Sequence, residues 1–170
     1  MRLFHVSEEA DLEIFHPRHD PTGRLGPVVW AIDEEHLPNY LLPRDCPRIT
    51  FAAGLGTSEQ DREAFLSSTT AGRVIAIESA WRERAARQAL WVYEMPASQF
   101  ESVDVCAGYF IARQAVRPES RELIPSALDA LLRRDIELRV LDTLWPLRDA
   151  VLESTLEYSI IRMRNAQPRE

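Results

Sequence analysis

The chain has 170 residues, a length typical of one domain, and its 45% hydrophobic and 28% charged residues are typical of an ordinary globular protein. The formal net charge of −7 disfavours general binding to nucleic acid or to an anionic membrane, which needs a basic surface. All 20 basic residues are arginines, which excludes a Schiff-base lysine, a lysine general base and a Walker-type phosphate loop.

The sequence also bears on targeting to a membrane and on the redox state of the cysteines. No stretch approaches 18 consecutive apolar residues, and residues 1–7 lack a basic region followed by a long apolar run. The two cysteines, Cys46 and Cys106, have no CxxC spacing and cannot form a disulfide framework. These observations predict a cytoplasmic protein with reduced thiols and no membrane partner.

The first half of the chain alternates short apolar runs with turn residues. Residues 2–6 predict a strand, and Ser7 predicts the N-cap of a short helix that turns Leu12 and Phe15 toward the core. The stretch 16–27 is rich in proline and glycine and predicts a loop. Further elements are expected in this order: a strand over 28–32, a helix from Asp33 to about Leu41, a strand over 48–52, a helix from Thr57 or Ser58, and a strand over 73–77.

The second half predicts a helix over 81–88, strands over 89–95 and 107–113, a helix over 126–134 and a strand over 137–140. From Pro146 onward, apolar residues recur at helical spacing and predict one long amphipathic helix through Leu147, Val151, Leu152, Thr155, Leu156, Ile160 and Met163. We expect this helix to dock on the sheet, with a partner-binding face as the alternative. Together the elements predict an α+β fold: a single domain over 1–170, with a mixed, mostly antiparallel sheet flanked by short helices and the long C-terminal helix.

Several familiar motifs are missing. The six glycines do not form GxGxxG, and neither GxSxG nor HExxH occurs. His16, His19 and Asp20 have metal-ligand residue types, and His5, His36 or Cys46 could complete a site. Two solvated loop histidines are the better interpretation, so no metal is expected.

Cys46 lies between Arg44 and Arg48, which leaves two interpretations. The arginines could lower the pKa of the thiol and make it reactive. Alternatively, they pair with neighbouring acids while Cys46 packs in the core.

A wider pattern resembles a known fold. His5-x-Ser7 on the opening strand, followed by a strand, an aspartate and a helix over 28–42, resembles the ADP-ribosyltransferase-like fold. The closest type includes the rifampicin ADP-ribosyltransferases and the RNA 2′-phosphotransferases. The resemblance covers about residues 2–116. It implies an NAD site in which His5 and Ser7 hold the ribose beside nicotinamide and Trp30 or Tyr40 stacks on the nicotinamide. Arg44 is the candidate contact to the pyrophosphate.

The later motifs of that fold also have counterparts. Residues 90–96, followed by Phe100 and Glu101, resemble the strand–proline–turn before the last motif, which then falls in 109–116. Active members carry a glutamate there, which bonds the ribose 2′-hydroxyl and stabilises the cation that forms as nicotinamide leaves. Gln114 occupies this position. Glutamine keeps the hydrogen bond but lacks the negative charge, which leaves ADP-ribosyl transfer in doubt, whereas binding of NAD or a related nucleotide would survive.

The whole chain, including residues 154–166, also resembles an uncharacterised bacterial protein family with no assigned activity. Three hypotheses follow: an NAD-using transferase or phosphotransferase relative, a non-catalytic module that binds a nucleotide or another small molecule, and a protein-interaction domain that uses the C-terminal helix. The acidic charge weakens an RNA-substrate version, although Arg18, Arg24, Arg44 and Arg48 could form a local arginine groove.

Overall fold

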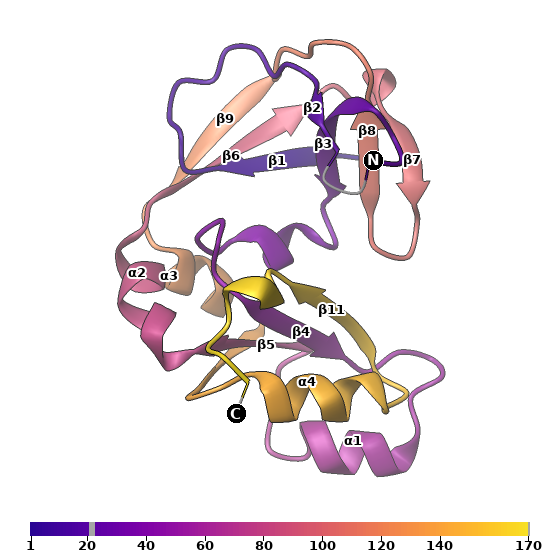
Figure 1. The fold of residues 1–170 in the computed structure, drawn as a ribbon, viewed down its shortest axis with the longest axis vertical. Helices are drawn as coiled ribbons and strands as arrows, with labels where there is room; N and C mark the ends of the chain where they lie inside the picture. The colour runs from indigo at the N-terminus through magenta and orange to yellow at the C-terminus, as the bar shows by residue number, and fades with distance from the viewer. Residues whose placement is uncertain (21–22, 170) are drawn as a thin grey trace. The chain divides into compact units, whose positions relative to one another are not determined.

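The computed structural model describes residues 1–20 and 23–169 and shows an α+β fold, as predicted (Figure 1). The chain forms two compact units. The first unit combines Met1–Leu41 with Ala89–Pro125, and the second combines Leu42–Gln88 with Ser126–Glu170. Each unit has its own sheet and its own buried cluster, and each is described separately below.

The first unit is built on an antiparallel sheet. Among the described residues, the strands run in the order β7-β8-β3-β1-β6-β9, and β2 pairs with β3. The strands expected over 2–6, 28–32, 89–95 and 107–113 are confirmed as β1, β3, β6 and β8. The bounds are β1 Leu3–Ser7, β2 Arg18–His19, β3 Pro27–Asp33, β6 Leu90–Met95, β7 Glu101–Asp104, β8 Tyr109–Ala112 and β9 Ser120–Ile124, with a short 3₁₀ helix, η3, at Ala97–Gln99.

One face of this sheet, called the core face here, carries the core of the first unit. Side chains alternate between the two faces along each strand, so Leu3 of β1, Ala31 of β3 and Tyr93 of β6 project to the same side. These three belong to a buried cluster with Phe15, Val29, Met95, Phe110, Ala112 and Val116. The other side of the sheet is called the opposite face.

The segment 8–16, all of it described by the structure, crosses the core face without forming a helix. The helix expected after Ser7 is therefore wrong. The Tyr93 hydroxyl donates a 2.7 Å hydrogen bond to the Glu9 carbonyl and accepts one of 3.2 Å from the Leu12 amide. Because Tyr93 satisfies these backbone groups outside a helix, the segment stays irregular and inserts Phe15 into the buried cluster. Of the loop expected over 16–27, residues 18–19 form β2, and residues 21–22 lie outside the described residues.

The helix expected from Asp33 is shorter than predicted. A turn follows β3, and only Leu37–Tyr40 form a helix, the 3₁₀ helix η1, with Pro38 in its first turn. The Asp33 carboxylate accepts a 2.8 Å hydrogen bond from the His36 amide, so Asp33 does cap a turn, as its residue type suggests.

The second unit has a four-stranded sheet in the order β10-β5-β4-β11, in which β10 and β5 are parallel and the other pairs antiparallel. The strands and helices predicted between residues 48 and 140 in this unit are confirmed within a few residues, and Ser58 and Ser126 cap α1 and α3. The bounds are β4 Arg48–Ala52, α1 Glu59–Leu66, β5 Arg73–Glu78, η2 Ser79–Trp81, α2 Arg82–Arg87, α3 Ala127–Leu132, β10 Ile136–Leu141, α4 Trp145–Leu152, β11 Glu157–Ile161 and η4 Met163–Asn165.

The long C-terminal helix predicted from Pro146 is wrong. The helix α4 begins as expected but ends at Leu152, and the chain then forms β11, which pairs with β4. The amide and hydroxyl of Thr155 both donate to the Asp61 carboxylate, which fixes the turn between α4 and β11. The hypothesis of a partner-binding face on a long helix is withdrawn with the helix.

The reason for this error lies in the spacing of the apolar residues. A spacing of four residues places side chains on one face of a helix, but four is also an even number, so it places them on one face of a strand. Leu156 belongs to the buried cluster of the second unit, and Ile160 packs against that cluster from the strand. The apolar pattern is amphipathic, as predicted. The spacing of its residues alone does not decide between a helix and a strand.

Candidate functional site

The structure places the residues of the expected NAD site on both faces of the first unit's sheet. His5 and Ser7 of β1 pair with Tyr93 and Trp91 of β6. His5 therefore shares the core face with Tyr93, and Ser7 lies on the same side. Trp30 alternates with the core residue Ala31 on β3, so its side chain projects from the opposite face.

His5 and Ser7 both contribute to the fold. His5 Nδ1 donates a 2.8 Å hydrogen bond to the Trp30 carbonyl, at the point where the pairing of β1 with β3 ends. The His5 ring lies 4.7 Å from the ring of Phe15, centroid to centroid. The Ser7 hydroxyl accepts a hydrogen bond from the Glu9 amide. His5 thus fixes the backbone from which the Trp30 side chain projects.

Three half-buried aromatic rings come together in the first unit: Trp30, Tyr40 and Tyr109, called the aromatic trio here. Tyr109 is in edge contact with both partners, with ring centroids 5.8 Å from Trp30 and 6.4 Å from Tyr40. The Tyr40 hydroxyl donates a 2.7 Å hydrogen bond to the Tyr109 hydroxyl. The resemblance implies Trp30 or Tyr40 as the stacking residue, and the structure brings both to the ring of Tyr109.

Asp33 and His36, at and just after the end of β3, form a pair that the sequence alone does not indicate. The Asp33 carboxylate accepts a 2.8 Å hydrogen bond from His36 Nδ1, and the two side chains are only 21% and 18% exposed. Gly108 lies against both, since a Cβ there would stand 2.4 Å from His36 Nδ1 and 2.6 Å from an Asp33 carboxylate oxygen. The available signal was an aspartate three residues before a histidine in a turn, and it was interpreted as a helix cap.

The trio and the Asp33–His36 pair come from neighbouring segments but different faces of the sheet: Asp33 pairs with Leu3 and so shares the core face, whereas Tyr109 pairs with Ile32 and projects from the opposite face. Gly108, which contacts the pair, directly precedes Tyr109, and the Asp33 amide donates a 3.1 Å hydrogen bond to the Gly108 carbonyl. Tyr40 ends η1, the turn that follows His36. The end of β3, η1 and the turn before β8 therefore converge, and all belong to the first unit.

Gln114 lies away from the aromatic trio, and Arg44 belongs to the second unit. Gln114 is exposed in a bend beyond β8 and lines an open hollow of about 410 Å³. Tyr109 begins β8, so the length of the strand, at about 3.3 Å per residue, separates it from Gln114. Arg44 is exposed and belongs to the second unit, and its carbonyl accepts a hydrogen bond from Arg162. The structure thus does not group Gln114 with Trp30 and Tyr40.

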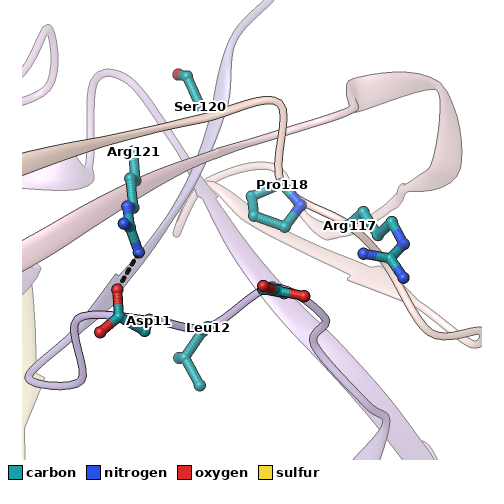
Figure 2. Close-up of a pocket in the computed structure, with 7 residues that line it drawn as sticks. Asp11, Leu12, Arg117, Pro118, Ser120 and Arg121 are labelled. Atoms are coloured by element: carbon teal, nitrogen blue, oxygen red, sulfur yellow. Dashed lines mark hydrogen bonds and ion pairs between the residues drawn. The ribbon is translucent and has the colours of Figure 1, made fainter.

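A second hollow, of about 460 Å³, lies between the segment around Asp11 and the start of β9 (Figure 2). In Figure 2 Arg121 points at Asp11, and the guanidinium donates a 2.6 Å hydrogen bond to the carboxylate. The guanidinium also lies over the Trp91 ring, 5.2 Å from its centroid. The Asp11 carboxylate raises the pKa of Arg121. Since Asp11 and Glu13 share the hollow with Arg117 and Arg121, the two signs of charge balance, and the hollow is not a basic anion site.

The histidines considered as metal ligands lie in separate environments. Across residues 1–20 and 23–169, no three His, Cys, Asp or Glu side chains form a group that could hold a metal ion. Asp20 is buried and accepts hydrogen bonds from the amides of Arg24 and Leu25, so it organises its own loop. Within the same described ranges, no helix has the length and hydropathy needed to cross a membrane.

The reactive-thiol interpretation of Cys46 is wrong. Cys46 is fully buried, and burial raises the pKa of its thiol to about 12, an effect that the nearby Arg48 only partly offsets. Arg48 is buried as well and donates to the carbonyls of Pro43 and Cys46. Arg48 is therefore unable to contribute to the expected arginine groove, and Arg18 and Arg24 lie in the other unit from Arg44.

We expect one of the two thiols to react with a disulfide reagent in the native protein. Cys106 is exposed, whereas a thiol with a pKa of about 12 is ionised in about one molecule in 10⁴ at about pH 8. Burial favours the neutral thiol, so the stability that it contributes is complete below the ordinary thiol pKa and is lost as the pH rises toward 12. Spectrophotometric counting of released thiolate, with and without concentrated urea, tests this. A Cys106→Ser variant should lose the native reaction, and two fast native thiols would contradict the assignment.

Comparisons with known proteins confirm that the chain resembles an uncharacterised family. The family described as "Family of unknown function (DUF6886)" matches residues 4–166, almost the entire chain, and the chain belongs to this family. No curated protein and no solved structure matches it. The family description names no activity, so the function is argued from the aromatic trio.

Proposed function

We propose that this member of the family of unknown function binds NAD or a related nucleotide through its first unit, with the aromatic trio as the surface for the planar ring of the ligand. The observation that supports this most directly is the convergence of Trp30 and Tyr40 on Tyr109, from three separate segments of the chain. Each ring is half-buried, so each is held by the fold and retains exposed surface.

Aromatic platforms of this kind suit nucleotides. A base or nicotinamide ring that stacks on a tryptophan or tyrosine gains about 1–3 kcal/mol, as judged by alanine substitution in nucleic-acid-binding proteins. The hydrogen-bonded hydroxyls of Tyr40 and Tyr109 add polar groups at the edge of the platform, where a carboxamide or a ribose hydroxyl would pair.

The role of His5 changes under this proposal. On the core face it does not share a surface with Trp30, but its bond to the Trp30 carbonyl ties the Trp30 backbone to β1. His5 is then a positioning residue that acts through Trp30, while Ser7 organises the turn after β1. Gln114 lacks the charge of the glutamate in active transferases and lies beyond the far end of β8, so the proposal is binding without a transfer step at Gln114.

Calorimetric titration with NAD tests the proposal. We expect saturable binding by the natural protein, and a loss of affinity of about ten-fold or more in Trp30→Leu because the stacking surface is removed. His5→Ala should weaken binding to a smaller degree, since it loosens the Trp30 backbone without removing the ring.

Trp91→Leu is the matched control. Trp91 is also half-buried, but it lies on the core face under Arg121. The affinity of the Trp91→Leu variant for NAD should therefore equal that of the natural protein. No heat at millimolar NAD would refute the proposal. An equal loss of affinity in both tryptophan variants would also refute it, because it would separate binding from the aromatic trio.

A further inference from the structure

Residues 166–169 of the second unit, called the strap here, return to the start of α4 (Figure 1). Both backbone groups of Gln167 are bound there. The Gln167 amide donates to the Glu78 carboxylate at 3.0 Å, and the Gln167 carbonyl accepts a 2.7 Å hydrogen bond from Trp145 Nε1. In extended backbone the N–H and C=O of one residue point to the same side, so one residue can make both bonds. Pro168 favours this backbone, because it disfavours a helical conformation in the residue before it.

Arg169 adds a side-chain contact two residues further along the strap. Its guanidinium donates to the Asp149 carboxylate at 2.5 Å and lies 5.5 Å from the centroid of the Trp145 ring. Trp145 and Asp149 are four residues apart in α4, so they lie on the same face of the helix. Glu78, Trp145 and Asp149 together are called the strap-binding surface.

The strap is attached to this surface and is not part of the core. Residues 167–169 are all exposed, so they bury no apolar side chain, and segments of this kind open at a low cost in free energy. The Leu144 amide donates to Glu78 independently of the strap. Arg148 pairs with a different oxygen of Asp149 from the one that the strap uses. The strap-binding surface is therefore held by contacts of its own and keeps its acceptors for an incoming segment.

We infer that the strap-binding surface docks an exposed, extended segment of a partner protein that carries an arginine two residues after the residue whose backbone groups are bound. The strap is then the competing occupant within the same chain. Backbone hydrogen bonds give affinity in this mode of recognition, and the side-chain contact gives specificity. The inference is independent of the proposed function, because all of its residues belong to the second unit.

Charge and shape complementarity favour arginine in the partner segment. The surface offers the carboxylate of Asp149 beside the indole face of Trp145, and a guanidinium can bind a carboxylate and stack on an aromatic ring at the same time. A lysine ammonium lacks the planar shape for both contacts. Because the strap is linked to the surface, its effective concentration is about millimolar, and a partner segment binds measurably when the strap is weakened or outcompeted.

Fluorescence anisotropy with a labelled peptide of residues 164–169, Arg-Asn-Ala-Gln-Pro-Arg, tests the inference on the whole chain. In Arg169→Ala the strap loses its ion pair and its contact with Trp145, so it competes less well. We expect the peptide to bind Arg169→Ala about ten-fold more tightly than the natural protein. Adding Asp149→Asn to Arg169→Ala should weaken peptide binding again by about three- to ten-fold, because the arginine of the peptide loses its carboxylate.

Two controls separate this docking from general attraction to an acidic protein. A peptide of the same composition in scrambled order should bind at least about ten-fold more weakly. Adding Glu63→Gln to Arg169→Ala removes an exposed carboxylate of α1 and should leave the affinity unchanged. No binding of the peptide to Arg169→Ala at millimolar concentration would overturn the inference. Equal affinity for the two peptides, or equal affinity of Arg169→Ala and the natural protein, would overturn it as well.

Discussion

Replacing Arg48 with methionine is expected to lower the free energy of unfolding by about 1–3 kcal/mol, because the buried Cys46 carbonyl loses its donor, whereas the Pro43 carbonyl keeps the Cys46 amide. The Arg48 side chain is among the largest fully buried ones, with 2% of the residue exposed. One guanidinium nitrogen donates to the Pro43 carbonyl at 3.1 Å and to the Cys46 carbonyl at 2.9 Å. Arg48 thereby ties the loop 43–47 to β4.

Urea unfolding of Arg48→Met, followed by tryptophan fluorescence, measures this effect. Arg48→Lys should also be destabilised, since a lysine ammonium cannot reproduce the planar arrangement of guanidinium donors. The control is Arg133→Met, at an exposed arginine at the end of α3, which should change stability by less than about 0.5 kcal/mol. Equal unfolding midpoints for Arg48→Met and Arg133→Met would contradict the role assigned to Arg48.

Replacing Glu78 with alanine is expected to lower the free energy of unfolding by about 1–3 kcal/mol or slightly more, because the buried Leu144 amide loses its acceptor and the Gln167 amide, at an exposed residue, adds a smaller amount. Glu78, at the end of β5, is 1% exposed. Its carboxylate accepts the Leu144 amide at 3.3 Å and the Gln167 amide at 3.0 Å, so it holds both the start of α4 and the segment after β11.

Glu78→Gln separates the lost acceptor from the lost volume. Glutamine keeps one acceptor oxygen and nearly the same shape, so its effect should be well below that of alanine. Glu63→Ala, in an exposed position of α1, is the control and should be close to neutral. Limited proteolysis adds a local readout, because Glu78→Ala should expose the chain near Gln167 to cleavage. Unchanged proteolysis and unchanged urea midpoints would count against this role.

These two residues show a general feature of the second unit. Arg48 and Glu78 lie in strands that are rich in apolar residues. For this reason the strands at 48–52 and 73–77 are predicted correctly from the sequence. The charged side chains themselves carried no sign of burial in the sequence. Their environment depends on carbonyls and amides from loops and termini that are distant along the chain, as the Gln167 amide on Glu78 illustrates.

The candidate site also has a part that the sequence predicts and a part that depends on distant contacts. Trp30 and Tyr40 were proposed from sequence as alternatives, because each is an aromatic residue in the expected second motif, and the structure shows that Tyr109 contacts both. The Asp33–His36 pair was missed because its third contact, Gly108, comes from a distant turn. Strand alternation then placed His5 on the other face from Trp30, which depends on sheet register and not on motif order.

The sequence by itself determined the α+β class, most strands and the starts of α1, α3 and α4, because alternation of apolar residues and N-cap residues such as Ser58 act locally. The absence of lysine excluded lysine-based catalysis, and the negative net charge disfavoured general binding to nucleic acid. Only the tertiary structure decided between helix and strand after Leu152, kept residues 8–16 out of a helix and brought Asp33, His36 and Gly108 together. In each of these cases the deciding hydrogen bonds or contacts join segments far apart in the chain, and such pairings leave no periodic signal in the residues that make them.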